Sequence, residues 1–164
     1  MRKRKIILSM AAIGAALSLS GCQVKGVTAD EWLTTQYADV PKIKYFCADL
    51  DDIFSSYITG AMSQEDFRDE IEMAAMIYNQ MLAERQQQDI RPGTYTEVSK
   101  TAHDGYEQMW VDLGNMLTAF LNADDSTVSD KNQVAYLYMA YGDSMKEDMD
   151  DYYAGYTAAG GVSQ

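Results

Sequence analysis

Apolar residues recur at helical spacing between Pro41 and Gly60. The stripe has a 4-3-4-3-4 spacing and consists of Ile43, Cys47, Leu50, Phe54, Tyr57 and Ala61. Residues at these intervals share one face of an α-helix, so the pattern predicts an amphipathic helix with one buried side. Proline suits the first turn of a helix, and glycine favours the left-handed backbone that ends one. We therefore expect this helix to begin near Pro41 and to end at Gly60.

Three later segments show the same periodicity. The pairs Ser63–Asp66 and Thr94–Glu97 are typical of helix starts, and the last segment begins at about Asp130. The stripes are Phe67, Ile71, Ala74, Tyr78 and Met81; then Val98, Ala102, Tyr106, Met109, Leu113, Met116 and Phe120; then Val134, Leu137 or Tyr138, Tyr141, Met145, Met149 and Tyr152. Arg91-Pro92-Gly93 and the polar residues 122–129 separate these segments, so we expect them to be connections.

The order and length of these segments predict an all-α fold. Four helices of similar length with short connections favour an antiparallel up-down-up-down four-helix bundle. The capping pattern of Thr28 and Glu31 adds a short extra N-terminal helix. We expect the helical bundle domain to cover residues 28–153 and residues 154–164 to form a flexible tail.

The first residues have a different pattern. Four cationic side chains in MRKRK precede an apolar run from Ile6 to Leu19. A basic start, a short apolar middle and small residues at the end are typical of a secretory signal peptide. The run is too short for a membrane-spanning helix, which needs about 20 apolar residues.

The end of this leader, Leu19-Ser20-Gly21-Cys22, resembles the lipobox of bacterial lipoproteins. That resemblance implies cleavage of residues 1–21 and attachment of diacylglycerol to Cys22, with residues 22–27 as the lipidated cysteine and a short linker. Two acyl chains anchor a protein stably, whereas one does not. We expect a protein on the extracytoplasmic face of the cell membrane. Gln23 gives no inner-membrane retention signal, so the outer membrane is open if the host has two membranes.

The charge of the chain limits its partners. The leader contains four of the 13 basic residues and none of the 25 acidic ones, which leaves nine against 25 and a formal net charge of −16. Nucleic acids and anionic lipids attract Lys and Arg clusters and repel such a surface. We therefore expect no nucleic-acid partner, and contact with the membrane through the lipid on Cys22.

The residue inventory predicts neither a cofactor nor a catalytic site. One histidine and two cysteines are too few for a Cys/His zinc site or a di-iron site. The loop from Asp124 lacks the glycine and glutamate of a calcium-binding EF-hand. Ser99 and His103 share a helix face, but Asp104 is about 100° away on an ideal helix, so we expect it not to orient the imidazole. We predict a protein that is not an enzyme and holds no metal.

Tyrosine and acidic residues gather on the fourth predicted helix. Tyrosine is favoured at interfaces, and like charges at helical spacing repel unless a cation or a basic partner offsets them. The candidate partner face consists of Tyr138, Asp143, Glu147, Asp150 and Asp151. We predict a non-catalytic interaction module of the cell envelope that binds another envelope protein or a basic cell-wall component. The alternative is a ligand- or metal-binding lipoprotein that uses the bundle core or this acidic stripe.

Overall fold

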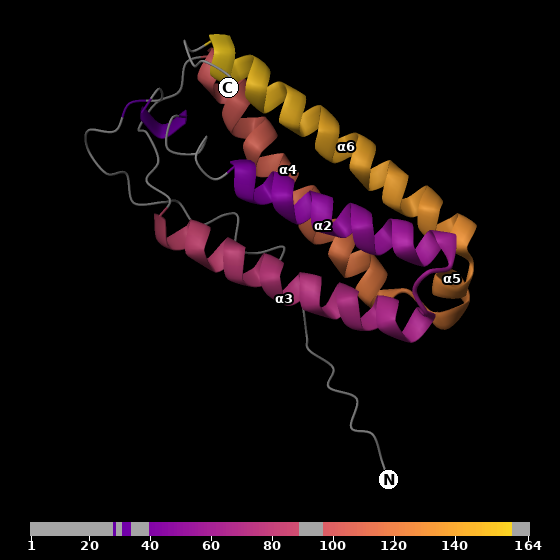
Figure 1. Ribbon diagram of the computed structural model, residues 1–164. Helices are drawn as coiled ribbons and strands as arrows, with labels where there is room; N and C mark the ends of the chain where they lie inside the picture. The colour runs from indigo at the N-terminus through magenta and orange to yellow at the C-terminus, as the bar shows by residue number, and fades with distance from the viewer. Residues whose placement is uncertain (1–27, 29–30, 34–39, 89–96, 159–164) are drawn as a thin grey trace.

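The computed structural model describes residues 28, 31–33, 40–88 and 97–158 (Figure 1). The leader, Cys22, the linker, the Arg91-Pro92-Gly93 break and residues 159–164 lie outside the described residues. Within them the regular structure is helical, with a helical turn at residues 31–33. The helices are α2 (Val40–Thr59), α3 (Gln64–Gln88), α4 (Glu97–Asn122), α5 (Asp125–Ser129) and α6 (Lys131–Ala158). The predicted all-α class is confirmed for this part of the chain.

Two side-chain caps and one glycine set three of the helix boundaries. The Thr28 backbone N–H donates to Glu31 Oε2 over 2.8 Å, and the Glu31 N–H donates to Thr28 Oγ1 over 3.2 Å, which is a reciprocal capping box. Before α3, the Asp66 N–H donates to Ser63 Oγ over 3.1 Å. Gly60 follows α2 with φ of +86°, a left-handed conformation that glycine adopts without strain. These predicted starts and stops are confirmed.

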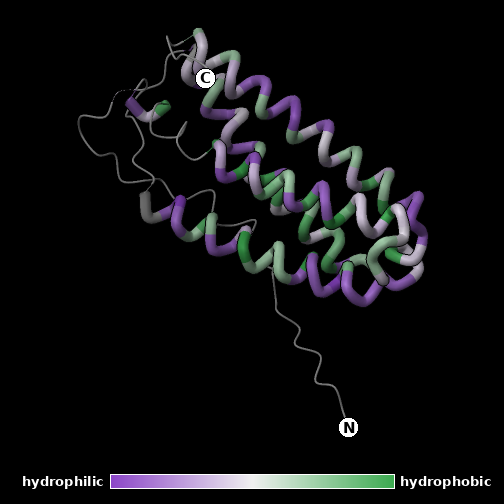
Figure 2. Tube along the Cα trace, in the orientation of Figure 1, coloured by the Kyte–Doolittle hydropathy of each residue, from purple (hydrophilic) through white to green (hydrophobic). Residues whose placement is uncertain are grey.

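The apolar stripes meet in one core. Phe54 of α2 lies at its centre, with ring centroids 5.3 Å from Phe67, 4.8 Å from Phe120 and 3.9 Å from Tyr138. These rings come from four different helices, so the cluster joins α2, α3, α4 and α6. Figure 2 shows hydrophobic and hydrophilic residues alternating along each helix, as this one-sided burial requires. Burial of such large apolar side chains is the main stabilising contribution.

The closest helix contact is between α4 and α6, and small residues make it possible. A Cβ added to Gly105 would lie 2.6 Å from the Asp148 carbonyl oxygen, and one added to Gly155 would lie 2.5 Å from Ala102 Cβ. Both distances are shorter than van der Waals contact allows. The two backbones therefore approach each other through glycine and alanine where Ala102 and Gly105 of α4 meet residues 148–155 of α6.

Hydrogen bonds from buried tyrosines connect the remaining elements. Tyr78 Oη of α3 donates to the Trp110 carbonyl of α4 over 2.9 Å, and Gly114 leaves room for the Tyr78 ring. Tyr57 Oη of α2 donates to the Val128 carbonyl of α5 over 2.6 Å. Each bond satisfies a buried hydroxyl that would otherwise cost free energy.

Two predicted boundaries differ from the structure. Residues 125–129, expected to be part of a polar connection, form α5, because Asp124 Oδ1 accepts from the Thr127 N–H over 2.7 Å and Val128 is buried. The helix α6 continues to Ala158, past the expected end of the domain at residue 153. Tyr156 is buried in this last part, its ring stacked 6.2 Å from that of Tyr152. Packing against α4 therefore holds residues that the sequence alone predicts to be flexible.

Candidate partner-binding surface

The solvent-facing side of α6 carries a continuous stripe of exposed residues. Tyr136 is 73% exposed and Met139 is 66% exposed. Further along the helix Asp143, Glu147 and Asp150 are exposed as well. The spacing of 3, 4, 4 and 3 places all five residues on one helical face. We call this stripe the α6 outer face.

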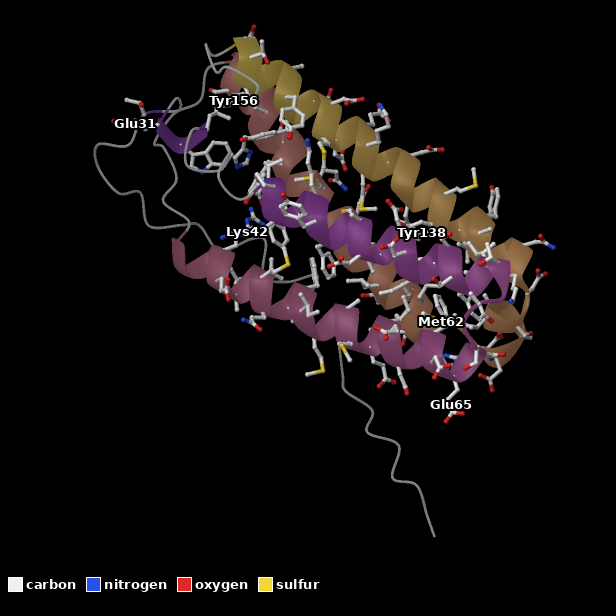
Figure 3. The ribbon with its side chains drawn as sticks, in the orientation of Figure 1. Glu31, Lys42, Met62, Glu65, Tyr138 and Tyr156 are labelled. Atoms are coloured by element: carbon white, nitrogen blue, oxygen red, sulfur yellow. The ribbon has the colours of Figure 1, made fainter. Side chains whose placement is uncertain are left out.

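Tyr138, which was predicted to belong to the partner face, lies on the opposite side of α6. Its ring stacks on Phe54 with a centroid distance of 3.9 Å and an interplanar angle of 11°. Its hydroxyl donates to Oδ1 of Asp51 on α2, and Figure 3 shows it between these two helices. Burial and the Asp51 carboxylate raise the pKa of Tyr138 well above its ordinary value. Tyr138 therefore contributes to the packing of α6 against α2, because its ring stacks on Phe54.

The acidic residues of the predicted face are exposed, and one of them is paired. Lys146 Nζ lies 2.5 Å from Asp150 Oδ2. This hydrogen bond and the Asp150 charge raise the pKa of Lys146, with a smaller contribution from Asp143. Asp143, Glu147 and Asp151 have a net negative charge that a cationic partner would neutralise. The face thus combines an apolar end with an acidic end.

A second acidic group lies at the edge of α6 that contacts α4. Asp112 is buried, and its carboxylate accepts hydrogen bonds from Ser144 Oγ and, over 2.8 Å, from Gln108 Nε2. Burial and the charge of Asp112 raise the pKa of Asp148 to about 6. Asp151 and Glu147 add to this effect. Asp148 is therefore partly protonated in weakly acidic solution.

The metal- or ligand-binding alternative can be compared with the side chains that the structure describes. Among them no three His, Cys, Asp or Glu side chains converge as ligands of one ion. Asp124 caps α5, and Met145 packs in the core. A pocket between α3 and α4 has a volume of about 20 Å³, room for one or two water molecules. It is lined by Phe67, Arg68, Ile71, Glu72, Phe120 and Leu121.

The imidazole of His103 contacts the neighbouring carboxylate, contrary to our expectation from ideal helix geometry. His103 Nδ1 lies 3.2 Å from Asp104 Oδ1. Ser99, the third residue of that constellation, is fully buried. Burial raises the pKa of the Cys47 thiol to about 11, which keeps it protonated and unreactive at neutral pH. Neither the Ser99 hydroxyl nor the Cys47 thiol is therefore an exposed nucleophile.

Two residues of the α6 outer face, Tyr136 and Met139, were missing from the sequence prediction. Counting back from Asp143 in steps of four and three reaches both, so the signal was present in the spacing.

Cys22 lies outside the described residues, and no helix among those described combines the length and hydropathy needed to cross a bilayer. No protein-family model, curated protein or solved structure matches this chain.

Proposed function

We propose that this protein is a lipid-anchored interaction module of the bacterial cell envelope, carried on Cys22 at the extracytoplasmic face of the membrane. The basic leader, its apolar run and the Leu19-Ser20-Gly21-Cys22 sequence support the anchor. The domain is an antiparallel up-down-up-down four-helix bundle. Residue pairs support that topology: Tyr57 near the end of α2 meets Val128 ahead of α6, and Lys44 near the start of α2 meets Tyr153.

The linker keeps the bundle close to the lipid. Six residues, 22–27, span at most about 20 Å when extended. Trp32 and Leu33 then fix the chain to the bundle: Trp32 lies 5.1 Å from the His103 ring, and Tyr152 Oη donates to the Leu33 carbonyl over 3.3 Å. The helical turn at 31–33 and the end of α6 share one end of the molecule, opposite α5 (Figure 1). That end faces the membrane in our proposal.

The observation that carries the proposed function is the α6 outer face. Tyr136 and Met139 supply exposed apolar area near the start of α6, next to α5 and away from the proposed membrane side. Asp143 and Glu147 follow, and both are exposed and negatively charged. Aromatic and methionine side chains are enriched in interfaces, and acidic side chains select cationic partners. The partner is an envelope protein or cell-wall component with positive charge.

Site-specific crosslinking tests this face. A photoreactive amino acid replaces Tyr136 in one variant and Tyr45 in another, because Tyr45 on α2 is 74% exposed and is a matched control. We expect crosslinking in intact cells from position 136 and not from position 45. Combining the first variant with Asp143→Asn and Glu147→Gln should abolish the crosslink. Equal crosslinking from both positions, or a crosslink that survives the neutral substitutions, would contradict the proposal.

Intact mass spectrometry tests the anchor separately. Protein extracted from its own host in mild detergent should lack residues 1–21 and carry diacylglycerol on Cys22. The Cys22→Ser variant should keep its leader and lack the lipid. An unmodified Cys22 in the wild-type protein would refute the anchor, whatever the crosslinking shows.

A further inference from the structure

A second exposed apolar patch lies on α3. Met73 is 55% exposed, Met76 is 73% exposed and Ile77 is 45% exposed. Their spacing of three and four places them side by side on the outer surface of the helix. The core positions of the same segment are filled by Ala74, Ala75 and Tyr78, which are buried. These three large side chains therefore contribute to the surface rather than to the core.

Acidic residues flank this patch at both ends. Asp66 and Asp69 lie toward the start of α3 and Glu84 lies toward its end, all exposed and all on the same helical side. We call this set, with Met73, Met76 and Ile77, the α3 outer face. Exposed apolar side chains rimmed by one sign of charge mark an interaction site more strongly than apolar residues alone.

Both basic residues of α3 point away from this face. Arg68 donates to the Ala123 carbonyl over 3.1 Å and to Asp125 over 2.8 Å. Arg85 is 7% exposed, pairs with Glu107 and lies over the Tyr106 ring at 4.9 Å. The acids of the α3 outer face therefore have no cation from their own helix to offset them.

From this arrangement we propose that the α3 outer face binds a basic amphipathic helix of a partner protein. The apolar side of such a helix would cover Met73, Met76 and Ile77, and its Lys or Arg residues would meet the acids at both ends. Flexible methionine side chains adapt well to a helical ligand. This surface is separate from the α6 outer face, because α2 and α4 lie between α3 and α6 (Figure 1).

Charge decides against a second copy of this chain as the occupant. An antiparallel pair of α3 helices would bring Asp66 and Asp69 of one copy close to Glu84 of the other, and a parallel pair would align identical acids. Each arrangement places like charges opposite one another, and the whole chain has a formal net charge of −12. Anionic lipid is disfavoured for the same reason.

Methionine oxidation provides a direct test with the protein as isolated from its host. The probe is a helical peptide of Leu and Lys, with Leu at positions i, i+3, i+4 and i+7 and a length of about 18 residues, since shorter helices are marginal in water. Dilute hydrogen peroxide converts exposed methionines to sulfoxides, which mass spectrometry locates. We expect the peptide to slow oxidation of Met73 and Met76 several-fold. Buried Met109 and Met116 report that the fold is intact.

Matched variants complete the experiment. Met73→Gln with Met76→Gln should abolish peptide binding measured by fluorescence anisotropy, whereas Tyr45→Gln, at a 74% exposed position on α2, should retain it. A peptide with Glu in place of Lys should not bind. The proposal is overturned if the Lys peptide fails to protect Met73 and Met76, if it protects Met139 instead, or if the Glu peptide protects equally. Protection of Met76 before any peptide is added would overturn the proposal, because another copy or an apolar phase would already cover the patch.

Discussion

At the scale of single residues, Tyr136 and Tyr138 are two positions apart and have opposite environments. Tyr138 stacks on Phe54 and bonds to Asp51, so Tyr138→Ala should lower the free energy of unfolding by about 2–3 kcal/mol. Tyr136 is exposed, so Tyr136→Ala should change the free energy of unfolding by less than about 0.5 kcal/mol. Urea unfolding monitored by circular dichroism measures both. Similar losses in the two variants would show that the orientation of α6 is wrong.

The pKa of Asp148 gives a prediction about pH. Its folded-state pKa of about 6 lies above the ordinary aspartate value of 3.8, so the folded protein binds this proton more tightly than the unfolded chain does. The contribution of this group to stability is therefore fully present below about pH 4 and is lost as the pH rises through about 6. Asp148→Asn removes the ionisation cost and should raise the melting temperature at pH 8 but barely change it at pH 4.

The control for this effect is Asp143→Asn, which removes an exposed charge on the same helix. It should shift the melting temperature only slightly at either pH. An Asp148→Asn variant that is no more stable than wild type at pH 8 would show that ionised Asp148 does not destabilise the fold beside Asp112.

Sequence spacing located the acidic part of the candidate site and misplaced its tyrosine. Asp143, Glu147, Asp150 and Asp151 are exposed as predicted, because charged side chains remain solvated unless they find a partner. The core stripe of α6 fitted Leu137 and Tyr138 equally well, and both pack against the core, Tyr138 because of the position of Phe54 opposite its ring. That position depends on tertiary packing, which a single stripe does not encode.

At the scale of the helices, the tight α4–α6 contact depends on glycine. Gly105→Ala would place its Cβ 2.6 Å from a backbone oxygen of α6, and backbone cannot move aside cheaply. We expect this variant to lose about 2 kcal/mol of stability, as overpacked cores do. Gly142→Ala is the matched control: its Cβ would meet nothing within 4 Å, so helix propensity alone should stabilise the protein by about 0.5–1 kcal/mol. A stabilising Gly105→Ala would show that the helices are farther apart.

Helix boundaries marked by a local cap were predicted better than the other boundaries, for a physical reason. The caps at Thr28, Ser63 and Gly60 are local interactions within a few residues, so the sequence displays them directly. The short helix α5 is held by one cap and by burial of Val128, and five residues are too few to show a period. The last turns of α6 contain Gly155, a residue type that usually weakens a helix. Ala102 of α4 packs directly against Gly155 and leaves no space for a Cβ atom there.

At the scale of the whole molecule, negative charge opposes the compact state. The chain has 25 acidic and 13 basic residues, and several cations are already paired, including Arg68, Lys100 and Lys146. The remaining acids on the α3 and α6 outer faces repel one another over distances that salt can screen. Raising ionic strength from about 0.01 M to 1 M shortens the screening length from about 30 Å to 3 Å.

We therefore expect sodium chloride to raise the melting temperature progressively over this range. Asp69→Lys combined with Asp143→Lys should reduce the effect, because the formal net charge of −12 falls in magnitude by four with no loss of buried contacts. Differential scanning calorimetry of both proteins at each salt concentration makes the comparison. If salt instead lowered the melting temperature of the wild-type protein, its exposed ion pairs would outweigh the repulsion. The two acidic faces would then be stabilised by the cations beside them, and neither would need a basic partner to offset its charge.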